Sequence, residues 1–397
     1  MRAWLVVGLL WVVAMLNYLD RQVIFSLFPP IRADLHATDW QLGLLGAAFL
    51  WVYGALSPFS GYLADKYDRV KVILVSLFVW SAVTWLTGHS RGFNELLFAR
   101  GLMGISEAAY LPAALALIAD YHKPATRSLA TGIHQSGLYA GIALGGVFGG
   151  WMGEHYGWRT AFASLGLVGL AYAVVLLFLL RAPASSEREE TLKTSFGPSL
   201  LELMRTSGFR WVLAANTMGA MAYFIIYAWM PLFLFERFKM SLTDAGFTAT
   251  FYIQMASVAG ILAGGWLADR WSRKNERGRV LTQWIGFSMA APALFGIAIA
   301  DSRLVLVAGM LVFGLGRGFF DCNLMPVVCQ VTRPQLRATG YGVLNFASTI
   351  VGGVMTAVAG GLKATLGLSA ALQISAVLLF CAALLLLRVR PVRATAS

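Results

Sequence analysis

The chain alternates between long apolar runs and short polar connections over almost its whole length. Each run holds about 20 residues, which is the length that an α-helix needs to cross the hydrocarbon core of a bilayer. The pattern therefore predicts about twelve spanning helices and no strands. Their expected ranges are 4–28, 40–63, 71–89, 94–119, 127–150, 159–181, 211–234, 243–267, 279–300, 304–329, 338–361 and 367–388.

One long polar stretch, "RAPASSEREETLKTSFGPSLLELMRTSGFR" at residues 181–210, interrupts this alternation. Its Pro, Ser and Glu content is typical of a linker, and "LLELM" within it predicts a short amphipathic piece at the surface. The stretch leaves six apolar runs on each side. We therefore predict an N-terminal bundle at residues 1–181, a linker at 182–210 and a C-terminal bundle at 211–397.

The composition favours a multi-pass membrane protein over a soluble one. Hydrophobic residues make up 58% of the 397 residues and charged residues only 13%, whereas a soluble domain carries about a quarter charged residues. The first apolar run lacks a small-residue cleavage site and more runs follow it, so we expect a first helix and not a signal peptide. The three cysteines, in apolar segments, have neither disulfide nor metal-ligand spacing. No nucleophile–base arrangement is found either, so we expect no enzyme, metal or cofactor.

Lysine and arginine gather on one side of the predicted membrane. With the N-terminus in the cytoplasm, the cytoplasmic side receives about three cations for each one outside, which is the distribution that multi-pass proteins show. We therefore expect both termini in the cytoplasm and, because the connections are compact, a bacterial inner membrane. The formal net charge of +12 follows mostly from this distribution, and no nucleic-acid partner is needed to explain it.

An internal repeat links the two halves. The connection after the second run reads "GYLADKYDRVK" at residues 61–71, and the connection after the eighth reads "GGWLADRWSRK" at residues 264–274. Both contain G-x-L-A-D-[KR]-x-x-R, and about half the chain separates them. Two six-helix halves in the same orientation, as in parallel repeats, would produce this spacing.

With these features the whole chain resembles the major facilitator superfamily. The loop motif of that family has the form G-x-x-x-D-[RK]-x-G-[RK]-[RK], and here Asp68 replaces its second glycine. The resemblance implies an all-α membrane fold of twelve helices in two six-helix pseudo-repeats. It also implies that the motif and its copy form a latch between the halves. The alternative is a plain positive-inside loop with no latch role. The latch residues are Gly61, Asp65, Lys66, Arg69, Asp269, Arg270 and Arg273.

Asp20 and Arg21 lie inside the first apolar run, in "MLNYLDRQVIF". A charge at the centre of a spanning helix costs about 3 kcal/mol by insertion measurements, so such residues are usually functional. "NYLDR" and the segment "RGLMGISEAAYLPAALALIADY", which contains Glu107, resemble two branches of the superfamily. One branch is the anion:cation symporters, which include sugar-acid/proton symporters, and the other is the spinster-type lysolipid transporters.

Asp20 and Glu107 are expected at a shared depth. Asp20 lies about 24 Å along its helix from the cytoplasmic end, and Glu107 about 20 Å from the outer end of a helix that runs the other way. The resemblance places both helices beside a central cavity. We therefore predict that the two acids carry a coupling proton and that Arg21 anchors a substrate carboxylate, because arginine stays charged and binds carboxylates through two hydrogen bonds. A static buried ion pair is the alternative.

Further polar residues in the apolar runs are predicted to contact substrate: Asn17, Gln135, Tyr139, Tyr223, Tyr227, Gln254, Arg317, Asp321, Asn323 and Asn345. Arg317 and Asp321 are four residues apart, so they can equally pair within one helix. Arg100 is either part of the site or an outer structural cation, and His134 is either a packing residue or a proton relay. Glycines spaced by four residues from 137 to 149 predict close helix packing.

These features together predict a proton-coupled secondary transporter that imports a small organic anion, such as a sugar acid, by alternating access. The expected partners are this anion, protons as the coupling ion, and the lipid bilayer, and a monomer is the expectation from the family. A spinster-like lysolipid transporter or a proton-coupled drug exporter is the alternative. A receptor or scaffold of the same fold that transports nothing is disfavoured, because it would not need the buried acids.

Overall fold

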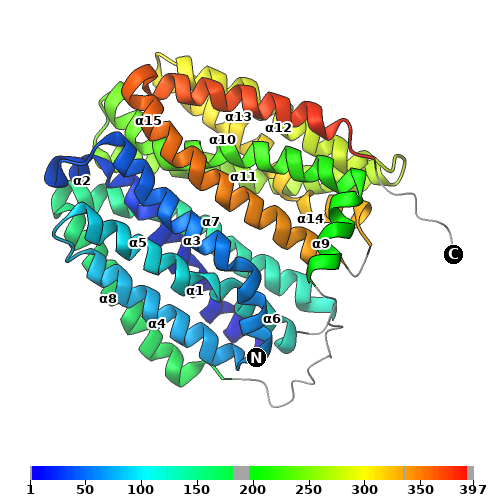
Figure 1. The fold of residues 1–397 in the computed structure, drawn as a ribbon, viewed down its shortest axis with the longest axis horizontal. Helices are drawn as coiled ribbons and strands as arrows, with labels where there is room; N and C mark the ends of the chain where they lie inside the picture. Colours follow the sequence, from blue (N-terminus) through cyan, green and yellow to red (C-terminus); the bar gives the residue numbers. More distant parts are fainter. Residues whose placement is uncertain (1, 123, 182–195, 334–335, 391–397) are drawn as a thin grey trace. The chain divides into compact units, whose positions relative to one another are not determined.

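The computed structural model describes all residues except 1, 123, 182–195, 334–335 and 391–397 (Figure 1). Every regular element in the described residues is a helix. The helices are α1 (Arg2–Ser26), α2 (Phe28–Leu35), α3 (Asp39–Lys66), α4 (Arg69–Thr87), α5 (Phe93–Ala108), α6 (Tyr110–Tyr121), α7 (Pro124–His155), α8 (Gly157–Leu179), α9 (Phe196–Arg205), α10 (Ser207–Phe238), α11 (Leu242–Ser272), α12 (Gly278–Ile299), α13 (Arg303–Asp321), α14 (Leu324–Val331) and α15 (Arg337–Leu386).

Ten helical segments of the described residues are long and apolar enough to cross a membrane. The expected number was about twelve, and the difference has two visible sources. Glycine-rich α7 is not among the ten, and the long α15 counts once although its backbone leaves helical geometry at Gly367, where φ is 79°. The membrane-spanning all-α class is therefore confirmed, whereas the count of twelve stays a prediction.

Two of the spanning segments are each broken into two helices near a proline. The break between α5 and α6 falls at Ala109, and the break between α13 and α14 falls at residues 322–323. Pro112 and Pro326 each follow within three residues. Proline has no N–H to donate to the carbonyl four residues earlier, so the helical hydrogen-bond ladder is interrupted there.

The chain packs into two compact units. Unit 1 comprises Met1–Glu190 and Tyr227–Phe251, and unit 2 comprises Thr191–Ile226 and Tyr252–Ser397. The domain boundaries predicted at residues 181 and 211 stay a prediction. About half of the predicted linker, residues 182–195, lies outside the described residues, and its "LLELM" segment falls in α9.

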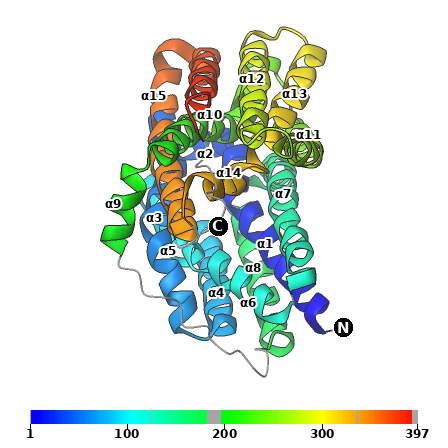
Figure 2. The same cartoon turned by 90° about the vertical axis from the view of Figure 1, so that its right-hand side faces the viewer.

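Within unit 1, α1 and α7 run side by side (Figure 2). A Cβ atom at Gly137 would lie 2.7 Å from the carbonyl oxygen of Trp11, and one at Gly145 would lie 2.8 Å from that of Leu19. The two helix backbones are thus too close for any side chain on α7 at these positions. The predicted close packing along the glycine series is confirmed.

The ends of α10 and α11 that belong to unit 1 are tied to its other helices by polar contacts. Arg32 in α2 donates to Glu236 at 2.9 Å and to Asp39 at 3.1 Å. Glu154 at the end of α7 accepts hydrogen bonds from the backbone N–H and the hydroxyl of Thr243, at 3.1 and 2.6 Å. These contacts hold the beginning of α11 and the end of α10 against α2 and α7.

In unit 2, α12 packs against both α13 and α15. The short α9 runs across the direction of α10, into which it leads (Figure 1). Leu203 on α9 is buried, and Glu202 pairs with Arg333 at 3.1 Å. This placement is the one expected of an amphipathic helix that lies along a membrane surface.

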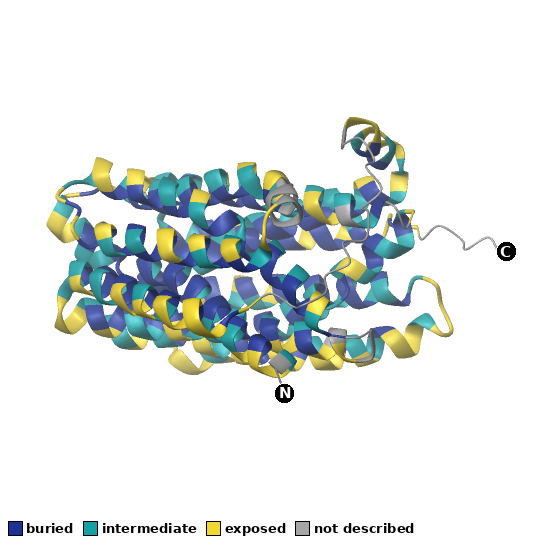
Figure 3. Cartoon of the chain, turned by 90° about the horizontal axis from the view of Figure 1, so that it is seen from below, coloured by how far each residue is buried: buried dark blue, intermediate teal, exposed yellow. Residues whose placement is uncertain are grey.

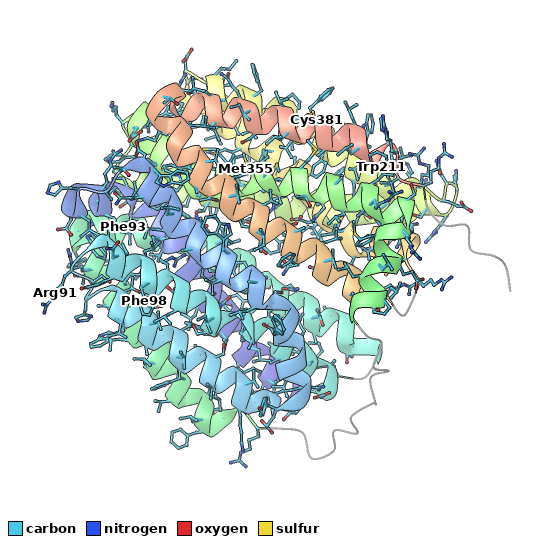
Figure 4. The ribbon with its side chains drawn as sticks, viewed as in Figure 1. Arg91, Phe93, Phe98, Trp211, Met355 and Cys381 are labelled. Atoms are coloured by element: carbon cyan, nitrogen blue, oxygen red, sulfur yellow. The ribbon has the colours of Figure 1, made fainter. Side chains whose placement is uncertain are left out.

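Burial alternates around the helices, as Figure 3 shows by colour. Large apolar side chains remain exposed on many of them, such as Phe98 on α5 (labelled in Figure 4), Leu304 and Trp266. In water such a surface would be unstable, but in a bilayer it contacts lipid chains. The fold is therefore that of a multi-pass membrane protein whose exposed apolar side chains face lipid.

Candidate functional site

Asp20 lies in the core of unit 1, in the last third of α1, and is only 2% exposed. The hydroxyl of Thr84 on α4 donates a hydrogen bond to its Oδ2. Its other oxygen, Oδ1, is buried and has no hydrogen-bond partner among the described residues. A buried polar atom without a partner is costly, so this oxygen is an unusual feature of the core of unit 1.

Glu107 occupies the last turn of α5, directly before the break with α6, and is fully buried. Arg21 on α1 donates from Nε to its Oε2 at 2.6 Å. The second oxygen, Oε1, again lacks a partner in the part of the chain that the structure describes. The structure thus shows a buried ion pair between Arg21 and Glu107, and each of the two acids has one bonded and one unpartnered oxygen.

Three aromatic rings surround the guanidinium of Arg21. Its Cζ atom lies 4.7 Å from the ring centre of Tyr18, 5.0 Å from that of Phe49 and 4.4 Å from that of Tyr53. Rings at this distance attract a cation electrostatically. Within the described residues, Nε makes the only hydrogen bond of this group, so its two terminal nitrogens keep their donors for another acceptor.

Sequence reasoning missed these three rings. Tyr18 lies one helical turn before Arg21, which is a visible signal. Phe49 and Tyr53 are also one turn apart on α3, but nothing in the sequence pairs that helix with α1. In a chain with 13% aromatic residues, an aromatic pair at helical spacing is too common to indicate a site.

Arg100, which the sequence left between two roles, is 1% exposed and has no acidic partner within 4 Å among the described residues. Its Nε donates to the carbonyl oxygen of Leu45 at 3.3 Å, and Nη1 lies 3.3 Å from the sulfur of Met103. Its Cζ atom is 5.1 Å from the ring centre of Phe49, the same ring that flanks Arg21. Arg100 therefore belongs to the buried cluster and is not half of an outer ion pair.

The charges of this cluster balance only when both acids are ionised. Asp20 and Glu107 then offset Arg21 and Arg100. Each proton that binds to an acid leaves one positive charge without compensation in a buried environment, where charge interactions are strong. Protonation of either acid would therefore give the cluster a net positive charge.

Other predicted residues of unit 1 lie around or beside this cluster. The amide nitrogen of Asn17 lies near Glu107 but has no hydrogen-bond partner among the described residues. Gln135 and Tyr139 are half-buried on α7, and Gln135 has an unpartnered buried oxygen. The half-buried Tyr227 belongs to unit 1, where its carbonyl oxygen accepts from Gln22 at 3.4 Å.

His134 is in the apolar core of unit 1. Tyr110 donates its phenolic proton to the carbonyl oxygen of Leu10 at 2.9 Å, so His134 Nε2, also at 2.9 Å, is the donor to the phenolic oxygen. Tyr110 packs among Leu10, Trp80 and Leu117. The sequence left two roles open for His134, a packing residue or a proton relay, and these contacts support packing.

A second polar cluster lies in unit 2. Arg317 on α13 pairs through Nε with Asp321 at 3.1 Å, the spacing that the sequence predicts for an in-helix pair. Arg317 also lies 3.5 Å from the amide oxygen of Gln254 on α11 and 5.7 Å from the ring centre of Tyr223 on α10. Four of the predicted substrate residues, from three helices, are therefore brought together in this cluster.

Two predicted residues of unit 2 are less involved. The side chain of Asn323 donates back to the carbonyl oxygen of Phe319 at 3.1 Å, and so binds its own helix at the break. Asn345 is half-buried on α15. Contact between these two amides and a substrate stays a prediction.

The repeated loop motif is described only in part. The side chains of Gly61, Asp65 and Lys66 lie outside the described residues, whereas Arg69 pairs with Asp120 on α6 and lies 3.4 Å from the carbonyl oxygen of Ala116. Asp68, which departs from the family pattern, accepts from the backbone N–H of Lys71 at 2.9 Å and thereby caps α4. The departure thus has a local reason, since Asp is a strong N-cap residue.

In the second copy of the motif, Asp269 pairs with Arg279 on α12 at 3.3 Å. Arg270 lies over the ring of Trp266 at 5.6 Å, and Arg273 is exposed. Each of these contacts joins residues of a single unit, so the latch role stays a prediction. The described residues contain no group of three or more His, Cys, Asp or Glu that could hold a metal ion.

Comparison with known proteins identifies the family of this fold. A sequence model of the Major Facilitator Superfamily matches residues 10–356. An MFS-type efflux pump of Mycolicibacterium smegmatis is 28% identical over 92% of this chain and 85% of that protein. A probable galactarate/D-glucarate transporter of Bacillus subtilis is 24% identical, over 91% and 88%. Protein spinster homolog 1 of Xenopus laevis is 26% identical, over 88% and 71%.

Among solved structures, a bacterial homolog of the human lysosomal transporter Spinster, in an inward-facing and unoccupied conformation, superposes with a TM-score of 0.83. The match covers 99% of both chains at 21% identity. At this identity the similarity is evidence for the fold alone.

Proposed function

This chain belongs to the Major Facilitator Superfamily of transporters, and from this premise we propose that it is a proton-coupled symporter that imports a small organic anion. A sugar acid is the substrate class that we favour. The transport cycle is alternating access, in which the substrate reaches its site from one side of the membrane at a time. The protein acts as a monomer in a bacterial inner membrane, with both termini in the cytoplasm.

The observation that carries this proposal is the 2.6 Å ion pair between Arg21 and Glu107, with Asp20 buried nearby. The guanidinium of Arg21 has two possible acceptors, the carboxylate of Glu107 and that of a substrate. While Glu107 is ionised, it holds Arg21 and neutralises it. When a proton from water binds Glu107, this hold is lost and the guanidinium donates two parallel hydrogen bonds to a substrate carboxylate.

Asp20 extends this coupling by a second route. Its protonation removes a negative charge from the same cluster, so the anion is favoured again. The Thr84 hydroxyl keeps one Asp20 oxygen bonded in either state. Return of the protons to water on the inner side restores both carboxylates, which then expel the substrate anion.

The neighbouring side chains favour a substrate with hydroxyl groups. Asn17 offers an amide N–H close to Glu107. The Tyr18 and Tyr53 rings hold Arg21 in place and leave little freedom to its side chain. A short anion with hydroxyls next to its carboxylate matches this mixture of one charged fork, an amide and aromatic walls.

The runner-up function is transport of a lysolipid or export of a drug. The names of the similar proteins divide between the favoured function and this one. They include a galactarate/D-glucarate transporter on one side and a spinster homolog and an efflux pump on the other. A lysophospholipid would bring a phosphate to Arg21 in place of a carboxylate. The buried amides and the ion pair favour a hydrophilic substrate.

The test is uptake into proteoliposomes under an inward proton gradient. The panel holds labelled galactarate, simple carboxylates and a lysophospholipid, each with and without a protonophore. Uptake of a carboxylate that the protonophore abolishes supports the proposal. Movement of the lysophospholipid alone would replace it with the runner-up, and carboxylate uptake that the protonophore leaves unchanged would remove proton coupling.

A further inference from the structure

Unit 2 repeats the arrangement around Glu107 with residues of its own. Glu107 occupies the last turn of α5, and Asp321 is the last residue of α13. In both cases the helix breaks within two residues, and a proline follows five residues after the acid, Pro112 and Pro326 respectively. The acid of each unit therefore lies at a point where the backbone ladder is interrupted.

The partners of the two acids are also alike. Each acid binds the Nε atom of an arginine, at 2.6 Å from Arg21 to Glu107 and at 3.1 Å from Arg317 to Asp321. Each of the two guanidinium groups lies against a tyrosine ring, at 4.4 Å from Tyr53 and 5.7 Å from Tyr223. The arginine comes from another helix in unit 1 and from the same helix in unit 2.

The pair in unit 2 lies deep in its span. Arg317 is about 21 Å from the first residue of α13 at 1.5 Å per residue. Ionisable side chains at such depth almost always face a bundle interior or water rather than hydrocarbon. The side chain of Asp321 is 27% exposed, whereas that of Glu107 is fully buried. Asp321 is therefore the more accessible of the two acids to a proton from water.

Few other ionisable groups surround Asp321. Arg317 on its own helix, Tyr223 on α10 and Cys322 next in the chain lie within its electrostatic range. The helices packed nearby add two amides, Gln254 on α11 and Gln283 on α12, and one carboxyl group, Asp269 on α11, which lies within electrostatic range of Cys322. The charged residues of α12 and α15 within the described residues are Arg279, Arg337 and Lys363, which are not among these neighbours.

We propose that Asp321 is a second proton-binding carboxyl of this transporter and that its protonation frees Arg317 to bind a carboxylate in unit 2. The proposal rests on the proposed function and extends it to a second, independent coupling group. A proton from water binds the Asp321 carboxylate, and the ion pair with Arg317 is lost. The guanidinium, still positioned by Tyr223 and Gln254, then donates hydrogen bonds to a carboxylate of the transported anion. When the proton returns to water, Asp321 binds Arg317 again and the anion leaves.

The first test needs no substrate. Infrared difference spectra of the purified protein are recorded while the pH is varied across the neutral range, and the band of protonated carboxyl groups is followed. The wild type is expected to show a titrating band with a component that Asp321→Asn removes and Asp321→Glu restores at a shifted position; the components from Asp20 and Glu107 remain in both variants. Glu202→Gln is the control, because Glu202 forms an ion pair of the same 3.1 Å length in unit 2, outside the spans.

A spectrum that Asp321→Asn leaves unchanged would overturn the proposal, because Asp321 would then neither bind nor release a proton over this pH range. Folding of each variant is checked by its elution in size-exclusion chromatography. If Asp321→Asn does not fold, Asp321→Glu alone decides, since a titrating carboxyl at this position must change its band when the side chain is lengthened.

The second test uses labelled galactarate as the probe in proteoliposomes. One coupled proton fewer lowers the accumulation reached at a tenfold proton gradient by up to about tenfold. We expect this loss in Asp321→Asn, with galactarate exchange retained. Full accumulation in Asp321→Asn together with its loss in Glu107→Gln would overturn the inference and leave the proposed function intact. If the wild type itself does not accumulate galactarate, the proposed function fails for this probe, and the infrared titration still decides the inference.

Discussion

Arg21 is the residue on which the proposed anion site depends most. Its Nε is bound to Glu107, three rings surround it, and its terminal nitrogens keep their donors for another acceptor. A lysine in its place would keep the charge but lose the planar fork that matches a carboxylate. The geometry of the guanidinium, and not its charge alone, is therefore what the site requires.

Arg21→Lys is expected to weaken binding of the transported carboxylate at least about tenfold, because a hydrogen bond to a charged group contributes about 1.5–3 kcal/mol. The measurement is the concentration dependence of proteoliposome uptake. Arg91→Lys is the control, since the side chain of Arg91 is exposed at the end of a connection (Figure 4). Unchanged affinity in Arg21→Lys would remove this residue as the anchor.

Substitution of either acid is expected to affect uphill uptake more strongly than exchange. Asp20→Asn or Glu107→Gln abolishes uphill uptake driven by a proton gradient, because the amide cannot take up and release a proton. Exchange of labelled for unlabelled substrate persists in part, since it needs no net proton movement. Both reactions are measured in the same proteoliposomes. Concentrative uptake at the wild-type level in both variants would contradict the assignment.

The ionisable residues of the site were predictable from the sequence, but most of their surroundings were not. Asp20, Arg21 and Glu107 stand out because a charge is rare in an apolar run of spanning length. Thr84 and Phe49 do not stand out, because small polar and aromatic residues occur throughout such runs. Their part in the site depends on how α3 and α4 pack against α1, which no local pattern encodes.

The helices themselves follow closely from the apolar runs, since a backbone in hydrocarbon must satisfy its hydrogen bonds internally. The first run was expected at 4–28, and α1 occupies Arg2–Ser26. A separate short helix, α2, begins at Phe28, directly before Pro29 and Pro30. The break at Ala109 was not predicted, although Pro112 marked it. Proline is tolerated in spanning helices often enough that its presence alone does not predict a break.

The glycine series of α7 sets how closely that helix approaches α1. In Gly137→Ala the new methyl group would lie 2.7 Å from the carbonyl oxygen of Trp11, so one backbone must shift. We expect a loss of about 1–3 kcal/mol in stability, as for other overpacked positions. The measurement is thermal unfolding in detergent. Gly132→Ala on the same helix meets nothing within 4 Å and is expected to be neutral or stabilising; equal losses in both variants would contradict this account.

An ion pair links Asp34, on α2 and outside the spans, to Arg159 in the first turn of α8. Arg159 donates to Asp34 at 2.5 Å, and this hydrogen bond holds the pKa of the Asp34 carboxyl below its ordinary value of 3.8. A carboxyl whose pKa is lowered by folding stabilises the folded state above its ordinary pKa and loses this effect as the pH falls through the lowered value. Both side chains are partly exposed, so the effect is small.

Asp34→Asn is therefore expected to lower the melting temperature slightly at neutral pH. The difference from the wild type should shrink as the pH falls below 3.8. Melting curves of both proteins over a pH series measure it. A difference that stays constant to the lowest pH would show that the ionised form of Asp34 is not what stabilises the contact.

For the molecule as a whole, the fold class and the superfamily were predictable because they depend on features that persist along the chain. The apolar runs, the bias of the cations to one side and the repeated loop motif are each visible without a structure. The division into compact units was harder. Residues 227–251 belong to unit 1, because contacts such as Glu154 with Thr243 and Arg32 with Glu236 connect segments far apart in sequence.

The repeat also has a consequence for energetics. Each unit contains an arginine bound to an acid at a helix break. Breaking a buried pair is costly unless the charge of one partner is removed at the same time. Protonation of the acid would remove that charge, and the proposed coupling uses this step in both units.

The central claim is that substrate and protons move together through the Arg21–Glu107 pair. The most direct measurement is proton flux in weakly buffered proteoliposomes to which galactarate is added with no imposed gradient. The account predicts that the external medium becomes more alkaline when galactarate enters through the wild-type protein, and that Glu107→Gln abolishes this change. Entry of galactarate without any proton flux, or a proton flux that survives in Glu107→Gln, would contradict it.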